Sequence, residues 1–151
     1  MSLAAPKSIN PRDWQSRGNP QNLLGHSIFV IDEGPANAPI ILFLHGFPTS
    51  SWDWNLIWES LKKDYRLIAL DMLGFGFSDK PNRRDYSIHQ QADIVEALVK
   101  KNQLKEFHVL AHDYGDTVAQ ELLSRQIEEN GAGYWLSCCF LNGGLFPETH
   151  R

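Results

Sequence analysis

The stretch FHVLAHDYGDTVAQELL, residues 107–123, decides the fold of this chain. Its first five residues form an apolar run that is typical of a buried strand. Apolar residues then return at helical spacing, which predicts a helix over residues 117–127 with an inward face of Val118, Leu122 and Leu123. A short polar turn separates the two, so we expect the strand to run almost directly into the helix. Strands that alternate with single helices are typical of an α/β fold.

The same alternation extends to both sides of this stretch. Residues 40–44 (IILFL) are apolar without interruption, as in a parallel strand that is covered on both faces. Further strands are expected at residues 27–31, 65–70, 107–111 and 134–141. Successive strands joined by helices form right-handed crossovers in a parallel sheet. We therefore predict the α/β class, with a mostly parallel sheet and helices on both of its faces.

Two further helices have recognisable starts. One covers residues 54–61 by its apolar spacing, and Ser50 or Ser51 could cap it. The other begins at Ser87, where Gln90 stands at the capping-box position. The first helix carries aromatic residues that we expect in the core, with a substrate channel as the alternative: Trp52, Trp54 and Trp58.

Composition excludes several classes of protein. The chain has 151 residues with 14 basic and 18 acidic side chains, a net charge of −4, which argues against a nucleic-acid partner. It has no apolar run long enough to span a membrane, and a polar N-terminus leads us to expect a cytoplasmic protein. Adjacent Cys138 and Cys139 close no useful loop and cannot make a zinc site by themselves. No metal-ligand cluster and no cofactor motif is present, so we expect no metal and no cofactor.

The expected organisation is a leader followed by one domain. Residues 1–22 are polar and interrupted by prolines, which predicts a mobile leader. Residues 23–151 are expected to form the domain, and the chain stops at Arg151 shortly after a strand, with no helix to cover that strand. We interpret residues 23–151 as the first part of a longer protein.

Asp113 occupies the turn between the strand and the helix of the opening stretch. Small residues stand two before it and two after it, Ala111 and Gly115, which a sharp strand-to-helix turn requires. The turn would lift Asp113 out of the sheet beside a helix N-terminus, while His112 would point away from the site. A carboxylate there is ionised at neutral pH and needs no base to act as a nucleophile. The alternative is that Asp113 is an ordinary helix N-cap.

A second loop, His45-Gly46-Phe47-Pro48, follows the apolar strand at residues 40–44. Because ligands bind beyond the carboxyl ends of parallel strands, this loop and Asp113 are expected to meet. The backbone amides of Phe47 and Tyr114 would then form an oxyanion hole. The alternative is an ordinary turn punctuated by glycine and proline.

Four segments together resemble the α/β-hydrolase superfamily. They are HGFPTSSWDW from His45, LDMLGFGFSDKP from Leu70, HDYGDTVAQELL from His112 and NGGLFPETHR from Asn142. The resemblance is to the branch with an aspartate nucleophile, which includes epoxide hydrolases and haloalkane dehalogenases, and within it to the mesoderm-specific transcript group and its bacterial relatives. It implies the α/β-hydrolase fold, truncated before the helical cap domain.

The resemblance also implies a covalent mechanism. Asp113 would attack an electrophilic carbon to form an alkyl-enzyme ester, and a histidine-activated water would hydrolyse that ester. Phe47 and Tyr114 would supply the oxyanion-hole amides, and His45, Gly46 and Pro48 would shape their loop, with a cis bond at Pro48. Family members carry the catalytic histidine, its acid and the cap beyond the length of this chain, so we expect neither the histidine nor the acid here; His150 is a poor substitute for the base.

Departures from the family pattern bear on the substrate. Dehalogenases usually hold the halide with a tryptophan after the nucleophile and a second side-chain donor in the first loop, where this chain has Tyr114 and Phe47. Some also have their acid where this chain has Asn142. Asp116 stands where glycine is common, and its role is left open beyond that of an acid in the first turn of a helix.

We therefore expect an epoxide hydrolase-like enzyme that acts on a small apolar electrophile through Asp113. Two alternatives stay open. One is a dehalogenase-like hydrolase of haloalkanes or haloacids, and the other is a non-catalytic relative that binds a ligand or a partner. The sequence indicates no particular oligomeric state.

Overall fold

A computed structural model describes residues 6–82, 86–128 and 131–144 of the chain. A six-stranded sheet with the order β1-β2-β4-β3-β5-β6 forms its centre. The strands are β1 (Asn19–Leu23), β2 (His26–Glu33), β3 (Ile40–Leu44), β4 (Arg66–Leu70), β5 (Glu106–His112) and β6 (Tyr134–Leu141). Strands β4, β3, β5 and β6 run parallel to one another, while β2 pairs antiparallel with β4 and β1 antiparallel with β2. The predicted α/β class and mostly parallel sheet are confirmed.

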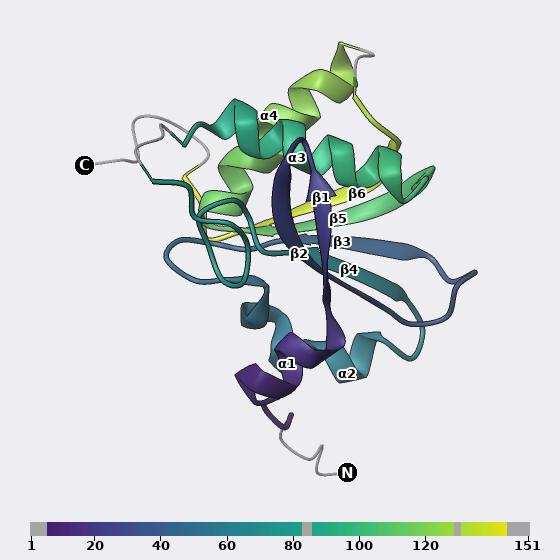
Figure 1. Cartoon of the computed structure of the whole chain (residues 1–151). Helices are drawn as coiled ribbons and strands as arrows, with labels where there is room; N and C mark the ends of the chain where they lie inside the picture. The colour runs from purple at the N-terminus through teal and green to yellow at the C-terminus, as the bar shows by residue number, and fades with distance from the viewer. Residues whose placement is uncertain (1–5, 83–85, 129–130, 145–151) are drawn as a thin grey trace.

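Helices cover both faces of the sheet, as Figure 1 shows. Helices α3 (Ile88–Lys101) and α4 (Tyr114–Ile127) lie on one face. On the other lie α1 (Pro11–Arg17), the 3-10 helix η1 (Ser51–Trp54) and α2 (Asn55–Leu61).

The central strand β3 shows why both faces need cover. Leu42 and Leu44 belong to the core cluster that also contains residues of α3 and α4. The residue between them, Phe43, packs on the other face with Trp54 and Trp58. Side chains alternate between the faces of a strand, so an uninterrupted apolar run is what a doubly covered strand requires. Trp54 and Trp58 are therefore core residues, as predicted, and Trp52 is partly buried against the same cluster.

The helix starts follow the predicted capping residues closely. Ser50 caps η1 by accepting from the Trp52 amide, and Ser87 caps α3 by accepting from the Gln90 amide. Only this half of the capping box is present among the described contacts, because Gln90 Oε1 is buried without a hydrogen-bond partner. Helix α4 begins at Tyr114, three residues before the predicted start at residue 117, because the whole reversal of the chain takes place at Asp113.

The predicted mobile leader is wrong for residues 6–22. Pro11–Arg17 form α1, with Pro11 at a favoured first-turn position and Asn10 as its N-cap, and residues 19–23 add β1 to the sheet edge. Trp14 is fully buried and donates from Nε1 to Ser51 Oγ at 3.0 Å. The single side chain of Trp14 thus anchors an otherwise polar segment to the core. A search for apolar runs in the sequence cannot detect an anchor of one residue. Residues 1–5 lie outside the described part of the chain.

Candidate active site

Three loops meet at the carboxyl edge of the sheet. His45 follows β3, Asp71 follows β4 and Asp113 follows β5. Because these strands are parallel neighbours, their carboxyl ends share one edge. The loop after β3 and the turn at Asp113 therefore come together as predicted, and the loop after β4 joins them.

Asp113 sits in a strained backbone conformation at the head of α4. Its φ of 51° and ψ of −114° lie where side-chain-bearing residues are rarely found. The half-buried side chain makes no capping hydrogen bond to α4. Asp113 therefore occupies the N-cap position of α4, but its carboxylate does not cap the helix, so the alternative of an ordinary N-cap is wrong.

Small residues make this turn possible. Ala111 is fully buried at the end of β5. A β-carbon built at Gly115 would lie 2.3 Å from the Leu44 carbonyl oxygen and 2.6 Å from that of His45. Only glycine lets the first turn of α4 approach the end of β3 this closely. The spacing that the sequence showed around Asp113 thus has a direct steric cause.

The Asp113 carboxylate binds the loop that follows β3. The Phe47 amide donates to Asp113 Oδ1 at 2.7 Å, and the Phe47–Pro48 peptide is cis, as the resemblance implied. A β-carbon at Gly46 would lie 2.8 Å from the Asp113 β-carbon, so the loop lies directly against the turn. Phe47 as a residue is 68% exposed next to this contact.

Tyr114 is the first residue of α4. The backbone amide at this position has no acceptor within the helix, as for every helix start. Its half-buried ring packs at 5.8 Å against Phe75, which lies 6.2 Å from Phe47. Burial raises the pKa of the Tyr114 hydroxyl, so it stays protonated. Phe47, Phe75 and Tyr114 form an aromatic rim beside Asp113.

His45 is buried beneath the loop. The Met72 amide donates to its Nε2 at 2.9 Å, and Nδ1 lies 2.9 Å from the Gly46 carbonyl oxygen. Burial lowers the pKa of the imidazole, which is therefore neutral at ordinary pH. A residue that faces two backbone groups and no solvent is a structural element of the loop, and it is not placed to act as a base.

Asp71 supports the same loop and was missed by the sequence analysis. Its fully buried carboxylate accepts from the Ser51 amide at 2.8 Å and from the Phe77 amide at 2.7 Å. A β-carbon at Gly76 would lie 2.0 Å from Asp71 Oδ2, which explains a glycine there. An acidic residue directly after a buried strand and before a glycine-rich loop was the available signal.

Asp116 lies in the first turn of α4 and is fully buried. Its Oδ1 is 3.4 Å from the Leu141 amide at the end of β6, and Oδ2 has no hydrogen-bond partner among the described residues. Burial raises the pKa of this carboxyl group. Asp116 is thus an acid in the first turn of α4, as expected, but its side chain is buried against β6 and Gly143.

The histidines do not supply a base within the described residues. The His112 ring lies 6.4 Å from the Trp54 ring, and its Nδ1 would lie 2.9 Å from a β-carbon built at Gly46. His89 pairs with Glu121 on the surface, and His108 with Ser137. His150 lies outside the described residues. No cluster of acidic, histidine and cysteine side chains in the described ranges could hold a metal ion.

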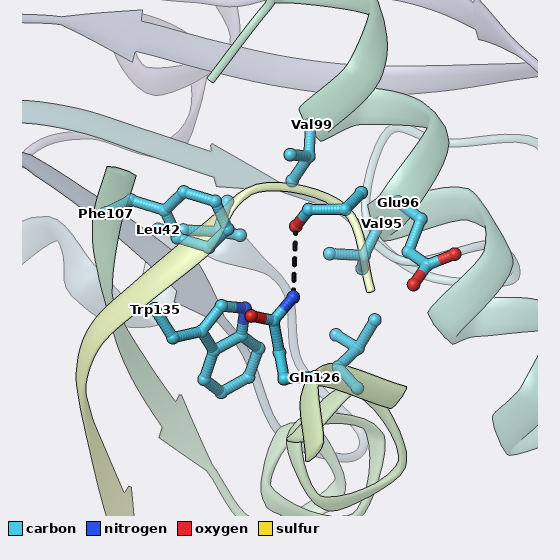
Figure 2. Close-up of a pocket in the computed structure, with 9 residues that line it drawn as sticks. Leu42, Val95, Glu96, Val99, Phe107, Gln126 and Trp135 are labelled. Carbon is cyan, nitrogen blue, oxygen red and sulfur yellow. Dashed lines mark hydrogen bonds between the residues drawn. The ribbon is translucent and has the colours of Figure 1, made fainter. Parts of the chain in front are cut away.

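One interior cavity lies away from this edge (Figure 2). It measures about 10 Å³, and residues of α3, α4, β3, β5 and β6 line it. Its lining includes Leu42, Glu96, Gln126 and Trp135, and Gln126 Nε2 lies 3.5 Å from the Ala132 carbonyl oxygen. A space of this size holds no more than about one water molecule. It does not reach Asp113 and serves as a packing defect rather than a ligand site.

The fold and the turn at Asp113 define a class of protein. The family model described as "alpha/beta hydrolase fold" matches residues 39–138, and the chain belongs to this family. Among curated relatives, it is 50% identical to the mesoderm-specific transcript homolog protein of Bos taurus over 97% of this chain and 46% of that protein. It is 38% identical to the putative hydrolase LipZ of Mycobacterium tuberculosis over 80% of this chain and 41% of that protein.

A solved structure shows the same likeness. The haloalkane dehalogenase DbeA from Bradyrhizobium elkani superposes with a TM-score of 0.74 at 29% identity, over 83% of this chain and 41% of that one. The resemblance to the α/β hydrolases and to the mesoderm-specific transcript group is confirmed. The chain spans about half the length of the curated relatives it matches. No helix in the described ranges has both the length and the apolar character needed to cross a membrane.

Proposed function

We propose that this chain carries the nucleophile of a hydrolase that works through a covalent ester on Asp113. The observation that carries the proposal is the 2.7 Å hydrogen bond from the Phe47 amide to the Asp113 carboxylate, made from a turn with φ 51°. A backbone conformation this costly persists where the surrounding structure holds it, and such sites are often functional. A carboxylate that only stabilised the helix would have bonded to α4.

The preferred substrate is an epoxide or a related small apolar electrophile. A carboxylate oxygen of Asp113 attacks a ring carbon, so one C–O bond forms while the ring C–O bond breaks, and the oxygen released takes a proton from an acid. A water deprotonated by a histidine then attacks the ester carbonyl carbon. The charge on the carbonyl oxygen is held by the amides of Phe47 and Tyr114. Collapse of this intermediate releases a diol and restores Asp113.

The base and its acid lie outside this chain in our proposal. The matched relatives are about twice as long, which leaves room for both groups. Pro48 and Gly46 shape the loop, while Ala111, His112 and Gly115 form the turn. The aromatic rim of Phe47, Phe75 and Tyr114 supports an apolar substrate, and no cofactor is required. Two free cysteines fit a cytoplasmic location, where thiols stay reduced.

Haloalkane hydrolysis is the second candidate. The likeness to the haloalkane dehalogenase DbeA favours it. Against it stands the side chain of Phe47, which cannot donate a hydrogen bond to a departing halide. A non-catalytic relative that binds a ligand or partner is the third candidate, and the strained turn at Asp113 argues against it.

Covalent labelling tests the proposal directly. The chain is incubated with a reactive aryl epoxide, and adducts are mapped by mass spectrometry of its peptides. We expect one adduct at Asp113, none in Asp113→Asn, and persistence of the ester because no base among the described residues is positioned to hydrolyse it. Exposed Asp64 is the internal control for indiscriminate carboxylate alkylation. Equal labelling of Asp64 and Asp113 would overturn the proposal, and halide release from haloalkanes with no epoxide adduct would favour the second candidate.

A further inference from the structure

The peptide between Gly46 and Phe47 is held at both of its ends. At one end the Gly46 carbonyl oxygen faces His45 Nδ1 at 2.9 Å, the Thr49 amide at 3.2 Å and the Thr49 hydroxyl at 3.2 Å. At the other end the Phe47 amide donates to Asp113 Oδ1 at 2.7 Å. The Phe47 N–H that the proposed function needs therefore belongs to the same peptide unit as the Gly46 carbonyl, and His45 and Thr49 hold that carbonyl in place.

Planarity couples these two ends. A peptide unit is flat, and in its trans form the C=O and N–H bonds point in opposite directions. A group that fixes the direction of the Gly46 carbonyl therefore also fixes the direction of the Phe47 N–H. A rotation of this plane would turn the amide away from Asp113 without moving the chain on either side very far.

The contacts of His45 determine which of its nitrogens carries the proton. A backbone amide can only donate, so Nε2, which receives the Met72 N–H at 2.9 Å, must be unprotonated. In the neutral ring the proton is then on Nδ1, which donates it to the Gly46 carbonyl oxygen. The opposite tautomer would set two donors against each other at Met72 and two acceptors against each other at Gly46.

We propose that His45 is a positioning residue, whose Nδ1–H tautomer is selected by the Met72 amide and aims the Phe47 N–H at Asp113 through the Gly46–Phe47 peptide. This inference rests on the proposed covalent chemistry for its purpose. His45 is fully buried, with its ring edge-on to Phe75 at 5.2 Å, so its ring has no freedom to leave this arrangement. A series of hydrogen bonds thus runs from the Met72 amide after β4 to His45, from His45 to the Gly46 carbonyl oxygen, and from the Phe47 amide to Asp113.

Two substitutions at this position separate the two hydrogen bonds. The amide nitrogen of asparagine takes the place of Nδ1, so His45→Asn can keep the donor to Gly46 while it loses the acceptor for Met72. Glutamine reaches the place of Nε2, so His45→Gln can keep that acceptor while it loses the donor to Gly46. His89→Gln on the surface of α3 is the matched control, because His89 is 75% exposed and lies outside the site.

The test uses NMR of the full chain together with the labelling rate at Asp113. In the unaltered protein, the ¹⁵N spectrum should show His45 protonated at Nδ1 only. The amide-proton chemical shift of Phe47 should change when Asp113 is replaced by asparagine, and this difference serves as the mark of the hydrogen bond between the Phe47 N–H and the Asp113 carboxylate. We expect His45→Gln to change the Phe47 shift in the same way, so that the mark is lost. The same variant should slow labelling by about 10²-fold, as misplacement of a reacting group can. His45→Asn should keep the mark, and His89→Gln should leave the mark and the rate unchanged.

The outcomes are distinguishable. A His45 ring protonated at Nε2 in the unaltered protein overturns the inference without any variant, even if both substitutions prevent folding. A Phe47 amide that keeps its mark in His45→Gln overturns it as well. If the NMR results hold but no epoxide labels Asp113, then the proposed chemistry fails while the positioning of the Phe47 amide by His45 stands.

Discussion

Gly46 lies so close to Asp113 that a β-carbon on residue 46 would come within 2.8 Å of the Asp113 β-carbon. It would also lie 2.9 Å from His112 Nδ1. The backbone on both sides is held by hydrogen bonds, so the added carbon cannot be accommodated by a flexible side chain. This contact joins the ends of β3 and β5 and leads to the first prediction.

Gly46→Ala should displace the loop and slow labelling at Asp113 by about 10²-fold, since a shift of roughly 1 Å can have this effect. The rate is followed by mass spectrometry under the conditions of the labelling experiment. Gly25→Ala is the control, because nothing lies within 4 Å of its added carbon although its φ is +83°. That control should cost about 1 kcal/mol of stability and leave the rate unchanged. Equal rates in the two variants would contradict the contact.

Trp14→Ala should destabilise the chain by about 3–5 kcal/mol, because it removes a fully buried ring that packs edge-on at 4.9 Å against Trp58. It also leaves Ser51 Oγ without its donor. Urea unfolding followed by circular dichroism measures the change. Trp14→Phe keeps the ring but not the Nε1–H, so its cost should be lower. An unchanged midpoint for Trp14→Ala would restore the view of this segment as a mobile leader.

Asp71→Asn should cost about 2–3 kcal/mol, since two backbone amides donate to separate oxygens of this buried carboxylate and asparagine offers only one. The Ser51 amide belongs to η1, which ends the loop after β3, and the Phe77 amide belongs to the loop after β4, so the loop after β3 should loosen as well. Thermal unfolding gives the cost, and amide hydrogen exchange at Ser51 gives the loosening. Asp64→Asn on the surface serves as the control and should change stability by less than about 0.5 kcal/mol. Identical behaviour of the two variants would count against the support role of Asp71.

Asp116 should make the chain less stable as pH rises from acid. Burial raises the pKa of its carboxyl above the ordinary value of 3.8, so the folded state binds the proton more tightly than the unfolded state. The contribution of Asp116 is therefore most favourable below the unfolded value and is lost as pH rises through the folded value. The free energy of unfolding of Asp116→Asn, relative to the unaltered chain, should increase across this range. The same difference at every pH would mean that the carboxyl does not titrate abnormally.

The strands and the turn could be predicted from the sequence because their signals are local. The run at residues 40–44 is apolar at every position because both faces of β3 are covered. Gly115 has no side chain because the backbones of β3 and α4 almost touch, and Ala111 is fully buried at the end of β5. Segment 11–23 escaped prediction because it is held by one indole and by strand pairing, neither of which leaves a periodic pattern.

What the sequence alone determined was the α/β class, the order of strands and helices after residue 23, and the chemical types gathered near Asp113, since these depend on spacing within a few residues. Tertiary structure alone decided which atoms meet. The Phe47 amide reaches a carboxylate 66 positions away, His45 receives the Met72 amide and so selects its tautomer, and Asp116 becomes buried against β6. Hydrogen-bond direction and desolvation are properties of groups brought together by packing, and no single stretch of chain contains them.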